Sequence, residues 1–234
     1  MEIIFNFLYQ IVFSIAVLVV FGLFLAYCRK SFCRILGSRG VLILLITGFV
    51  GVPIHELSHA FMCLIFGHKI VGIKLYQPLS VDGSLGYVRH TYNRKNFYQQ
   101  IGNFFIATAP IVLGSAFLLL LMLLFVPHVF FEVIAKLDFS NFLSTNLFES
   151  STYVVYLEKF RDIVWIIFDS SNIYNFLWWI YIVLALMIAS HMELSTADCR
   201  SAIKGFFYVA CGLLIADIIM FFVSKSALKT LLLQ

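Results

Sequence analysis

The stretch GFVGVPIHELSHAFMCLIFG, residues 48–67, places two histidines and a glutamate inside a long run of apolar residues. His55, Glu56 and His59 form the pattern HExxH. On a helix, residues four apart share one face, so His55 and His59 present two imidazole nitrogens to one metal ion while Glu56 lies beside it. The spacing therefore predicts a zinc site with His55 and His59 as ligands and Glu56 as the catalytic base that takes a proton from bound water.

The surrounding apolar run, about residues 41–67, is long enough to cross the roughly 30 Å of hydrocarbon in a bilayer. His55 is 14 residues from Val41 and 12 from Gly67, so the predicted site lies near mid-membrane. Two imidazoles and a carboxylate at that depth cost several kcal/mol unless they are paired, which favours a functional site. The alternative is a hydrogen-bonded network that joins packed helices.

The composition of the whole chain agrees with a membrane protein. Of 234 residues 62% are hydrophobic and 12% are charged, with a mean hydropathy of +0.99, which excludes an ordinary soluble domain. The 16 Lys and Arg residues stand in short clusters between apolar runs, where membrane topology and lipid head groups explain them, so no nucleic-acid partner is expected. Five spans are predicted, at about 3–28, 41–67, 98–126, 174–192 and 205–223. The expected fold is a single all-α polytopic domain, residues 1–234, with the lipid bilayer as its environment.

The connection 68–96 carries a turn signal. Asp82 and Gly83 stand between the short apolar stretches 79–81 and 85–88. An Asp-Gly pair between such stretches predicts a β-hairpin, here a short insertion after the second span.

The connection 127–173 is acidic, with six Asp or Glu residues against three bases. Its Phe, Val, Ile and Trp positions predict a helix that lies on the membrane surface. A covering loop with no part in the chemistry is the alternative.

The five cysteines form no CxxC pair and most lie in or beside apolar runs. This distribution predicts small buried hydrophobes and neither a disulfide framework nor a zinc ribbon.

A zinc ion held by two histidines needs a third protein ligand. In descending order the candidates are Asp198, Glu193 and His191, with His68, His90 and His128 in the connections. Asp198 follows the fourth predicted span, with Ser195 and Thr196 near enough to hydrogen-bond its carboxylate. The alternative role for Asp198 is a cap at the N-terminus of the last span.

The segment HELSHAFMCLIFGHKI, residues 55–70, resembles the site-2 protease family of intramembrane zinc metalloproteases. The resemblance continues in VDGSLGYV, residues 81–88, at the place of a membrane-associated hairpin, and in Ala109-Pro110 on the next span. It implies a zinc-dependent endopeptidase that cleaves transmembrane segments of protein substrates. It also implies a multi-pass protein of a bacterial inner or cell membrane. It also implies Zn²⁺ bound by His55, His59 and Asp198.

Substrate binding is expected at two places. Asn103 lies about two turns before Pro110 and is placed to hold substrate. The hairpin around Asp82 and Gly83 offers a strand edge for a locally unwound substrate, whose backbone groups need partners inside the membrane.

Two other functions remain open. ELSTAD, residues 193–198, is close to the ExxAD motif of membrane zinc proteases that process prenylated proteins, in which Glu193 would be the ligand. The second open function is a non-catalytic scaffold or regulator with a degenerate metal site. It stays open because Asp198 lacks the neighbouring Pro and Gly that the site-2 protease family has. The sequence predicts no oligomeric state.

Overall fold

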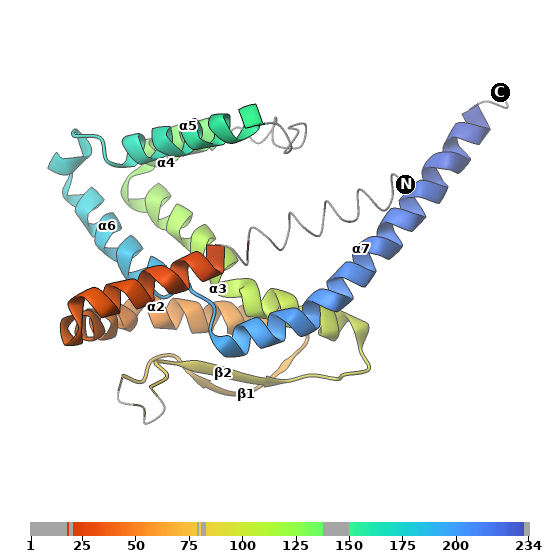
Figure 1. The fold of residues 1–234 in the computed structure, drawn as a ribbon, viewed down its shortest axis with the longest axis horizontal. Coiled ribbons are helices and arrows are strands. Elements are labelled where there is room, and N and C mark those ends of the chain that lie inside the picture. The colour runs from red at the N-terminus through yellow and green to blue at the C-terminus, as the bar shows by residue number, and fades with distance from the viewer. Residues whose placement is uncertain (1–17, 19–20, 79, 81–82, 138–149, 232–234) are drawn as a thin grey trace. The chain divides into compact units, whose positions relative to one another are not determined.

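The computed structural model describes residues 18, 21–78, 80, 83–137 and 150–231. Most of these residues are helical, and a two-stranded antiparallel sheet follows the helix that carries HExxH (Figure 1). Residues 21–36 are helical; after them come α2 (Ser38–Ile65), β1 (Lys69–Lys74), β2 (Tyr87–Thr91), α3 (Phe97–Phe125), α4 (Pro127–Leu137), α5 (Ser150–Ile167), a short 3₁₀ helix (Asn172–Tyr174), α6 (Phe176–Ala189) and α7 (Thr196–Leu231).

The chain forms two compact units. The first comprises Met1–Gly114 and Met187–Gln234, and the second Ser115–Leu186. The unit boundaries fall inside α3 and α6, so these two helices each contribute to both units. The HExxH histidines, the sheet and α7 all belong to the first unit.

Three helices in the described part of the chain are long and apolar enough to cross a membrane: α2, α3 and residues 196–222 of α7. They correspond to the spans predicted at 41–67, 98–126 and 205–223. The run 174–192 forms only the 14-residue α6, about 21 Å long, which is shorter than the hydrocarbon layer. The run 3–28 lies mostly outside the described residues. The described residues therefore show a mostly helical chain with three helices that could cross a membrane, and five spans stay a prediction.

Large apolar side chains are exposed on α2, whereas several charged and polar ones are buried. Phe49 is 71% exposed and Leu64 is 70% exposed, whereas Glu56 and His59 on the same helix are buried. A soluble helix has the opposite arrangement, with apolar residues inside and charged residues outside. The distribution fits a helix in lipid whose polar face points into the protein.

The hairpin prediction is confirmed, but its strands differ from those expected. β1 and β2 pair antiparallel with Ile70 opposite His90, and a bulge interrupts the register between Ile70 and Gly72. The strand that pairs with β2 is thus Lys69–Lys74, whose β-branched residues favour an extended backbone. Of the stretch expected to pair, residues 79 and 81 lie outside the described residues. Gly83, with φ of +73°, accommodates the turn, and Asp82 lies outside the described residues.

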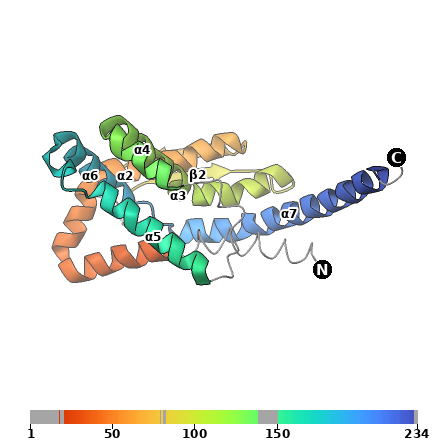
Figure 2. The same ribbon diagram turned by 90° about the horizontal axis from the view of Figure 1, so that it is seen from above.

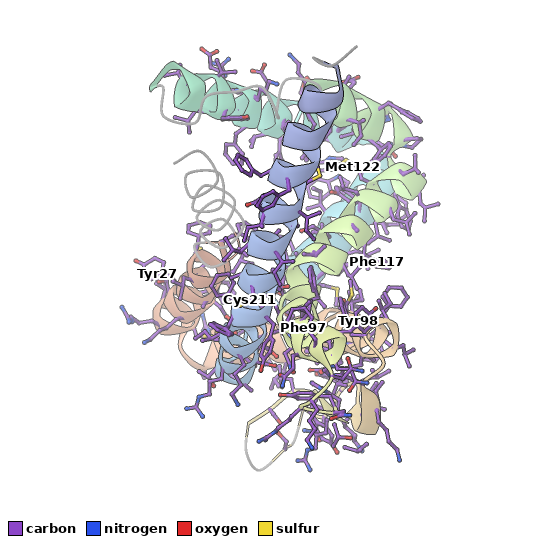
Figure 3. The ribbon with its side chains drawn as sticks, turned by 90° about the vertical axis from the view of Figure 1, so that its right-hand side faces the viewer. Tyr27, Phe97, Tyr98, Phe117, Met122 and Cys211 are labelled. Carbon is purple, nitrogen blue, oxygen red and sulfur yellow. The ribbon has the colours of Figure 1, made fainter. Side chains whose placement is uncertain are left out.

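Two glycines permit close helix contacts in the first unit. A Cβ atom at Gly51 in α2 would lie 2.2 Å from the carbonyl oxygen of Met187, and one at Gly205 in α7 would lie 2.1 Å from the backbone nitrogen of Phe104 in α3. The α3–α7 contact continues at the rings of Phe97 and Tyr208, whose centroids are 5.8 Å apart (Phe97 is labelled in Figure 3). These contacts set the end of α6 against α2, and α7 against α3.

The acidic connection contains two helices, α4 and α5, which lie side by side in the second unit (Figures 1 and 2). An ion pair joins them, with Lys136 Nζ 3.2 Å from Asp162 Oδ2. Hydrogen bonds from Arg161 and Lys136 hold the pKa of the Asp162 carboxyl below its usual value. The helical part of the prediction for 127–173 is confirmed for the described residues, and its position on the membrane surface stays a prediction.

Candidate metal centre

The HExxH residues lie on an unbroken helix, because α2 continues through Pro53 to Ile65. As predicted from their spacing, His55 and His59 share one face, with their Nε2 atoms 3.1 Å apart. The two rings meet edge to face, with centroids 4.8 Å apart. Both imidazoles therefore point at the same small volume.

Backbone carbonyls fix the orientation of both rings. The Nδ1 atom of His55 lies 2.7 Å from the carbonyl oxygen of His191, and Nδ1 of His59 lies 2.7 Å from that of Ile106. A carbonyl only accepts, so each Nδ1 carries a proton and the Nε2 of each neutral ring keeps its lone pair. Two lone pairs facing each other at 3.1 Å repel unless a cation lies between them, and a histidine with one nitrogen on a carbonyl is the usual arrangement of a metal ligand.

Asp198 completes the cluster from the first turn of α7. Its Oδ1 lies 3.4 Å from Nε2 of His59, and its Oδ2 lies 4.0 Å from Nε2 of His55. One ligand atom from each of the three residues lies within 4.8 Å of the others. Nitrogen ligands of tetrahedral zinc lie about 3.3 Å apart, so two imidazoles and a carboxylate at these separations suit a metal ion with an open fourth position.

Asp198 also takes part in the cap of its own helix. Ser195 N and Ser195 Oγ donate to Oδ2 of Asp198 at 2.9 and 2.5 Å, and Asp198 N donates back to Ser195 Oγ at 3.1 Å. This is a capping box with Ser195 as the N-cap. Asp198 is therefore not the N-cap itself, which was the alternative role; it is the third residue of α7, where Oδ2 bonds Ser195 and Oδ1 lies 3.4 Å from Nε2 of His59. Thr196, the first residue of α7, lines a cavity of about 410 Å³ that His55, His59 and Asp198 also line.

Glu56 lies beside the cluster on this cavity of about 410 Å³. The hairpin forms the opposite wall, and Gly86 lies so near that a Cβ there would be 2.9 Å from Glu56 Cγ and 3.0 Å from Oε1. The lining residues include His55, Glu56, His59, Asp198, Gly86, Tyr87, Val88, Arg89 and His90. A reactant that enters this cavity would meet the metal ligands, Glu56 and strand β2 together.

The runner-up ligand, Glu193, has another partner. Its Oε1 lies 2.7 Å from Nη2 of Arg29, and it does not belong to the cluster formed by His55, His59 and Asp198. Burial raises the pKa of Glu193, and the Arg29 guanidinium opposes that shift. The geometry therefore favours Asp198 as the third ligand.

The remaining histidines have different positions. His191 orients His55 through its carbonyl, and its Nε2 lies 3.0 Å from Thr47 Oγ1. His128 pairs with Asn172 in the second unit. His68 and His90 adjoin each other; burial first, and the His68 imidazole second, lower the pKa of His90 to about 4, so His90 is neutral at pH 7.

The predicted substrate residues lie apart from the metal cluster. Asn103 is 2% exposed, donates to the carbonyl of Gln100, and packs where α7 touches α3. It is not among the described residues that line the 410 Å³ cavity. Gly83 lies in the hairpin turn and lines a neighbouring cavity of about 910 Å³, which also reaches His55 and Glu56. Substrate binding by Asn103, Asp82 or Gly83 stays a prediction.

Sequence reasoning missed the groups that orient the ligands. The carbonyls of Ile106 and His191 carry no side-chain signal, because any residue supplies a carbonyl. Gly86 and Gly205 allow other parts of the chain to come close to their backbone. The sequence shows the glycines but not which residues approach them. Ser195 was not missed, because its hydrogen bond to the Asp198 carboxylate was predicted from the sequence and is confirmed.

Comparison with known proteins gives no match, whether to a family model, to a curated protein or to a solved structure. The case for a function therefore depends on the geometry of the site itself.

Proposed function

We propose that this protein is a zinc-dependent intramembrane endopeptidase of the site-2 protease type, which cleaves transmembrane segments of membrane proteins. The observation that carries the proposal is the pair of Nε2 atoms of His55 and His59, 3.1 Å apart, with the Asp198 carboxylate beside them. Each Nδ1 is committed to a carbonyl, so the face presented by the two rings is a metal-binding face. The glutamate of HExxH lies on the same cavity, as hydrolysis by metal-bound water requires.

Zinc bound by the three ligands would lower the pKa of a bound water and polarise the substrate carbonyl. Glu56 accepts the proton of the attacking water and transfers it to the nitrogen of the leaving amine. His55 and His59 keep their orientation throughout, because their Nδ1–H groups donate to fixed carbonyls. Ser195 holds Asp198 in place through two hydrogen bonds to its Oδ2.

The hairpin supplies a surface for an extended substrate. A helical transmembrane segment hides its peptide bonds in helical hydrogen bonds, so it must unwind before hydrolysis. Residues 86–90, which include most of β2, line the cavity beside Glu56 and the metal ligands. Pairing of the unwound segment with the edge of β2 would satisfy its backbone groups close to the attacking water.

The proposal includes the number of membrane spans and the membrane in which the protein lies. We infer a multi-pass protein with five spans, in which 3–28 and 174–192 cross the membrane as well as α2, α3 and α7, located in a bacterial inner or cell membrane. The exposed apolar faces of the three long helices support the membrane environment. Glu193 as ligand, the arrangement of a prenyl-protein protease, is disfavoured because Arg29 holds that carboxylate.

The test combines zinc analysis with cleavage of a single-span reporter substrate in detergent or in vesicles. We expect His55→Ala and Asp198→Asn each to lose about one zinc per chain relative to the wild type. Glu193→Gln is the matched control and keeps the metal. Glu56→Gln keeps zinc and loses cleavage by at least about 100-fold, because it removes the general base.

Three results would overturn the proposal. Absence of zinc from the folded wild-type protein would contradict the proposed metal centre. Unchanged zinc in His55→Ala removes the ligand assignment. Full zinc and no cleavage of any membrane reporter by the wild type favours a non-catalytic scaffold, especially if Glu56→Gln binds partners as the wild type does.

A further inference from the structure

A second group of metal-ligating side chains lies in the first unit, outside the proposed hydrolytic machinery. Cys63, His68 and His90 each offer one ligand atom, and these atoms lie within 4.8 Å of one another. Cys63 is completely buried and His68 is 4% exposed. The proposed hydrolysis uses none of the three.

The end of α2 brings Cys63 and His68 together. The helix ends at Ile65, and Gly67 adopts a left-handed conformation with φ of +66°. This turn lets the backbone N–H of His68 donate to the carbonyl of Cys63 at 2.8 Å. The His68 side chain is thereby directed back toward the last turn of the helix.

The hairpin and α3 complete the group. His90 on β2 stands opposite Ile70 on β1, two residues after His68, so strand pairing brings its ring beside that of His68. At Gly102 a Cβ would lie 3.0 Å from Nε2 of His68, so the absence of a side chain there lets α3 approach. Three separate parts of the chain thus converge on one point.

The hydrogen bonds of His68 show which nitrogen is available. Its Nε2 lies 2.8 Å from the carbonyl oxygen of Gln99 and must donate to it, so Nδ1 of the neutral ring keeps its lone pair. That lone pair faces Nδ1 of His90 at 2.9 Å. His68 is thus oriented as His55 and His59 are, by a carbonyl that binds one nitrogen and leaves the other for a ligand bond.

We propose that Cys63 Sγ, His68 Nδ1 and His90 Nδ1 bind a second metal ion of the thiolate-preferring class, with Zn²⁺ as the resident ion. One thiolate and two imidazoles are ligands that zinc accepts in tetrahedral sites, at about 2.3 Å for sulfur and about 2.0–2.1 Å for nitrogen. A tetrahedral site needs its two nitrogens about 3.3 Å apart, so the rings would separate by a few tenths of an ångström. His90 also lines the 410 Å³ cavity. A water molecule from that cavity would supply the fourth ligand.

The second ion has a structural role in this proposal. It would join the end of α2 to β2, and His68 in turn is hydrogen-bonded to Gln99 at the start of α3. The β2 strand follows Gly86, which contacts Glu56. The ion would therefore hold the hairpin wall of the cavity in place without taking part in hydrolysis.

Cobalt substitution tests this site separately from the HExxH site. A thiolate bound to Co²⁺ gives an intense near-ultraviolet charge-transfer band, which a site of two histidines and an aspartate lacks. We expect this band in the Co²⁺-loaded wild-type protein, its loss in Cys63→Ser, and its retention in the matched control Cys211→Ser. Cys211 lies on α7, where Figure 3 labels it.

Two further variants make the outcome decisive. His55→Ala, which removes the first site, should keep the band, so failure of one proposal does not imply failure of the other. A variant that retains Cys63 and has serine at the other four cysteines should also keep it. Absence of the band from the folded, Co²⁺-loaded wild type, or its survival in Cys63→Ser, would overturn the second site.

Discussion

Asp198 belongs to the capping box of α7 and is also the proposed third metal ligand. Its Oδ2 accepts two hydrogen bonds from Ser195 and so helps to cap α7, while its Oδ1 lies 3.4 Å from Nε2 of His59. The cap removes the rotational freedom of a side chain that would otherwise have to be ordered when metal binds. Ligand groups that are oriented in this way bind metal more tightly than free ones.

Replacement of Ser195 by alanine should therefore weaken metal binding. Ser195→Ala removes the Oγ hydrogen bond to Asp198, and loss of such a supporting group lowers metal affinity by about 10- to 100-fold. The measurement is a competitive zinc titration against a chromophoric chelator. Ser201→Ala is the control, since Ser201 lines the same cavity. Equal affinity in the two variants would contradict the positioning role of Ser195.

At the scale of elements, glycine contacts decide where the ligands lie. Gly205 on α7 is seven residues after Asp198, and its Cα rests against the backbone of Phe104 on α3. Ile106, whose carbonyl orients His59, lies two residues further along α3. The α3–α7 contact thus sets two parts of the metal centre at once.

A methyl group at Gly205 should disturb the centre. In Gly205→Ala the new Cβ would lie 2.1 Å from a backbone atom of Phe104, so α7 must move and carry Asp198 with it. We expect a loss of stability of about 1–3 kcal/mol, as for other overpacked sites, together with loss of zinc. Thermal unfolding in detergent and zinc analysis measure both effects.

Gly212→Ala on the same helix is the matched control. A Cβ at Gly212 meets nothing within 4 Å among the residues that the structure describes, so this change should leave zinc binding intact. Because alanine favours helix over glycine, it should also leave the melting temperature equal or slightly raised. Parallel losses in both variants would show that the α3–α7 contact does not position Asp198.

At the scale of the whole molecule, all residues of the proposed metal centre belong to one of the two compact units. The three candidate metal ligands, Glu56 and the hairpin belong to the first unit, whereas α4 and α5 belong to the second. The Lys136–Asp162 pair that joins α4 to α5 is partly exposed, and exposed ion pairs contribute little to stability.

Removing that pair should leave the metal centre unchanged. In the double variant Lys136→Ala, Asp162→Ala we expect zinc content and zinc affinity within about two-fold of the wild type, since an exposed ion pair contributes little to stability. Inductively coupled plasma analysis and the same chelator titration measure both quantities. A marked loss of zinc would mean that the second unit helps to form the site.

The sequence alone determined those features that depend on local periodicity. Four-residue spacing on a helix places His55 and His59 on one face, and the length of the apolar runs predicts α2, α3 and α7. The hairpin was also predictable, although its strands were not, because Lys69–Lys74 pairs with residues that lie 13 to 22 positions further along the chain.

Only the tertiary structure decided which distant groups meet. It brings Asp198 to the histidines and Glu193 to Arg29, a choice that the sequence left open because both carboxylates are near in the chain. It also brings Cys63 close to His68 and His90. From the position of Cys63 in an apolar run, the sequence had predicted only a buried hydrophobe. Helix packing and strand register set such contacts, and both depend on the shape of whole surfaces and not on spacing along the chain.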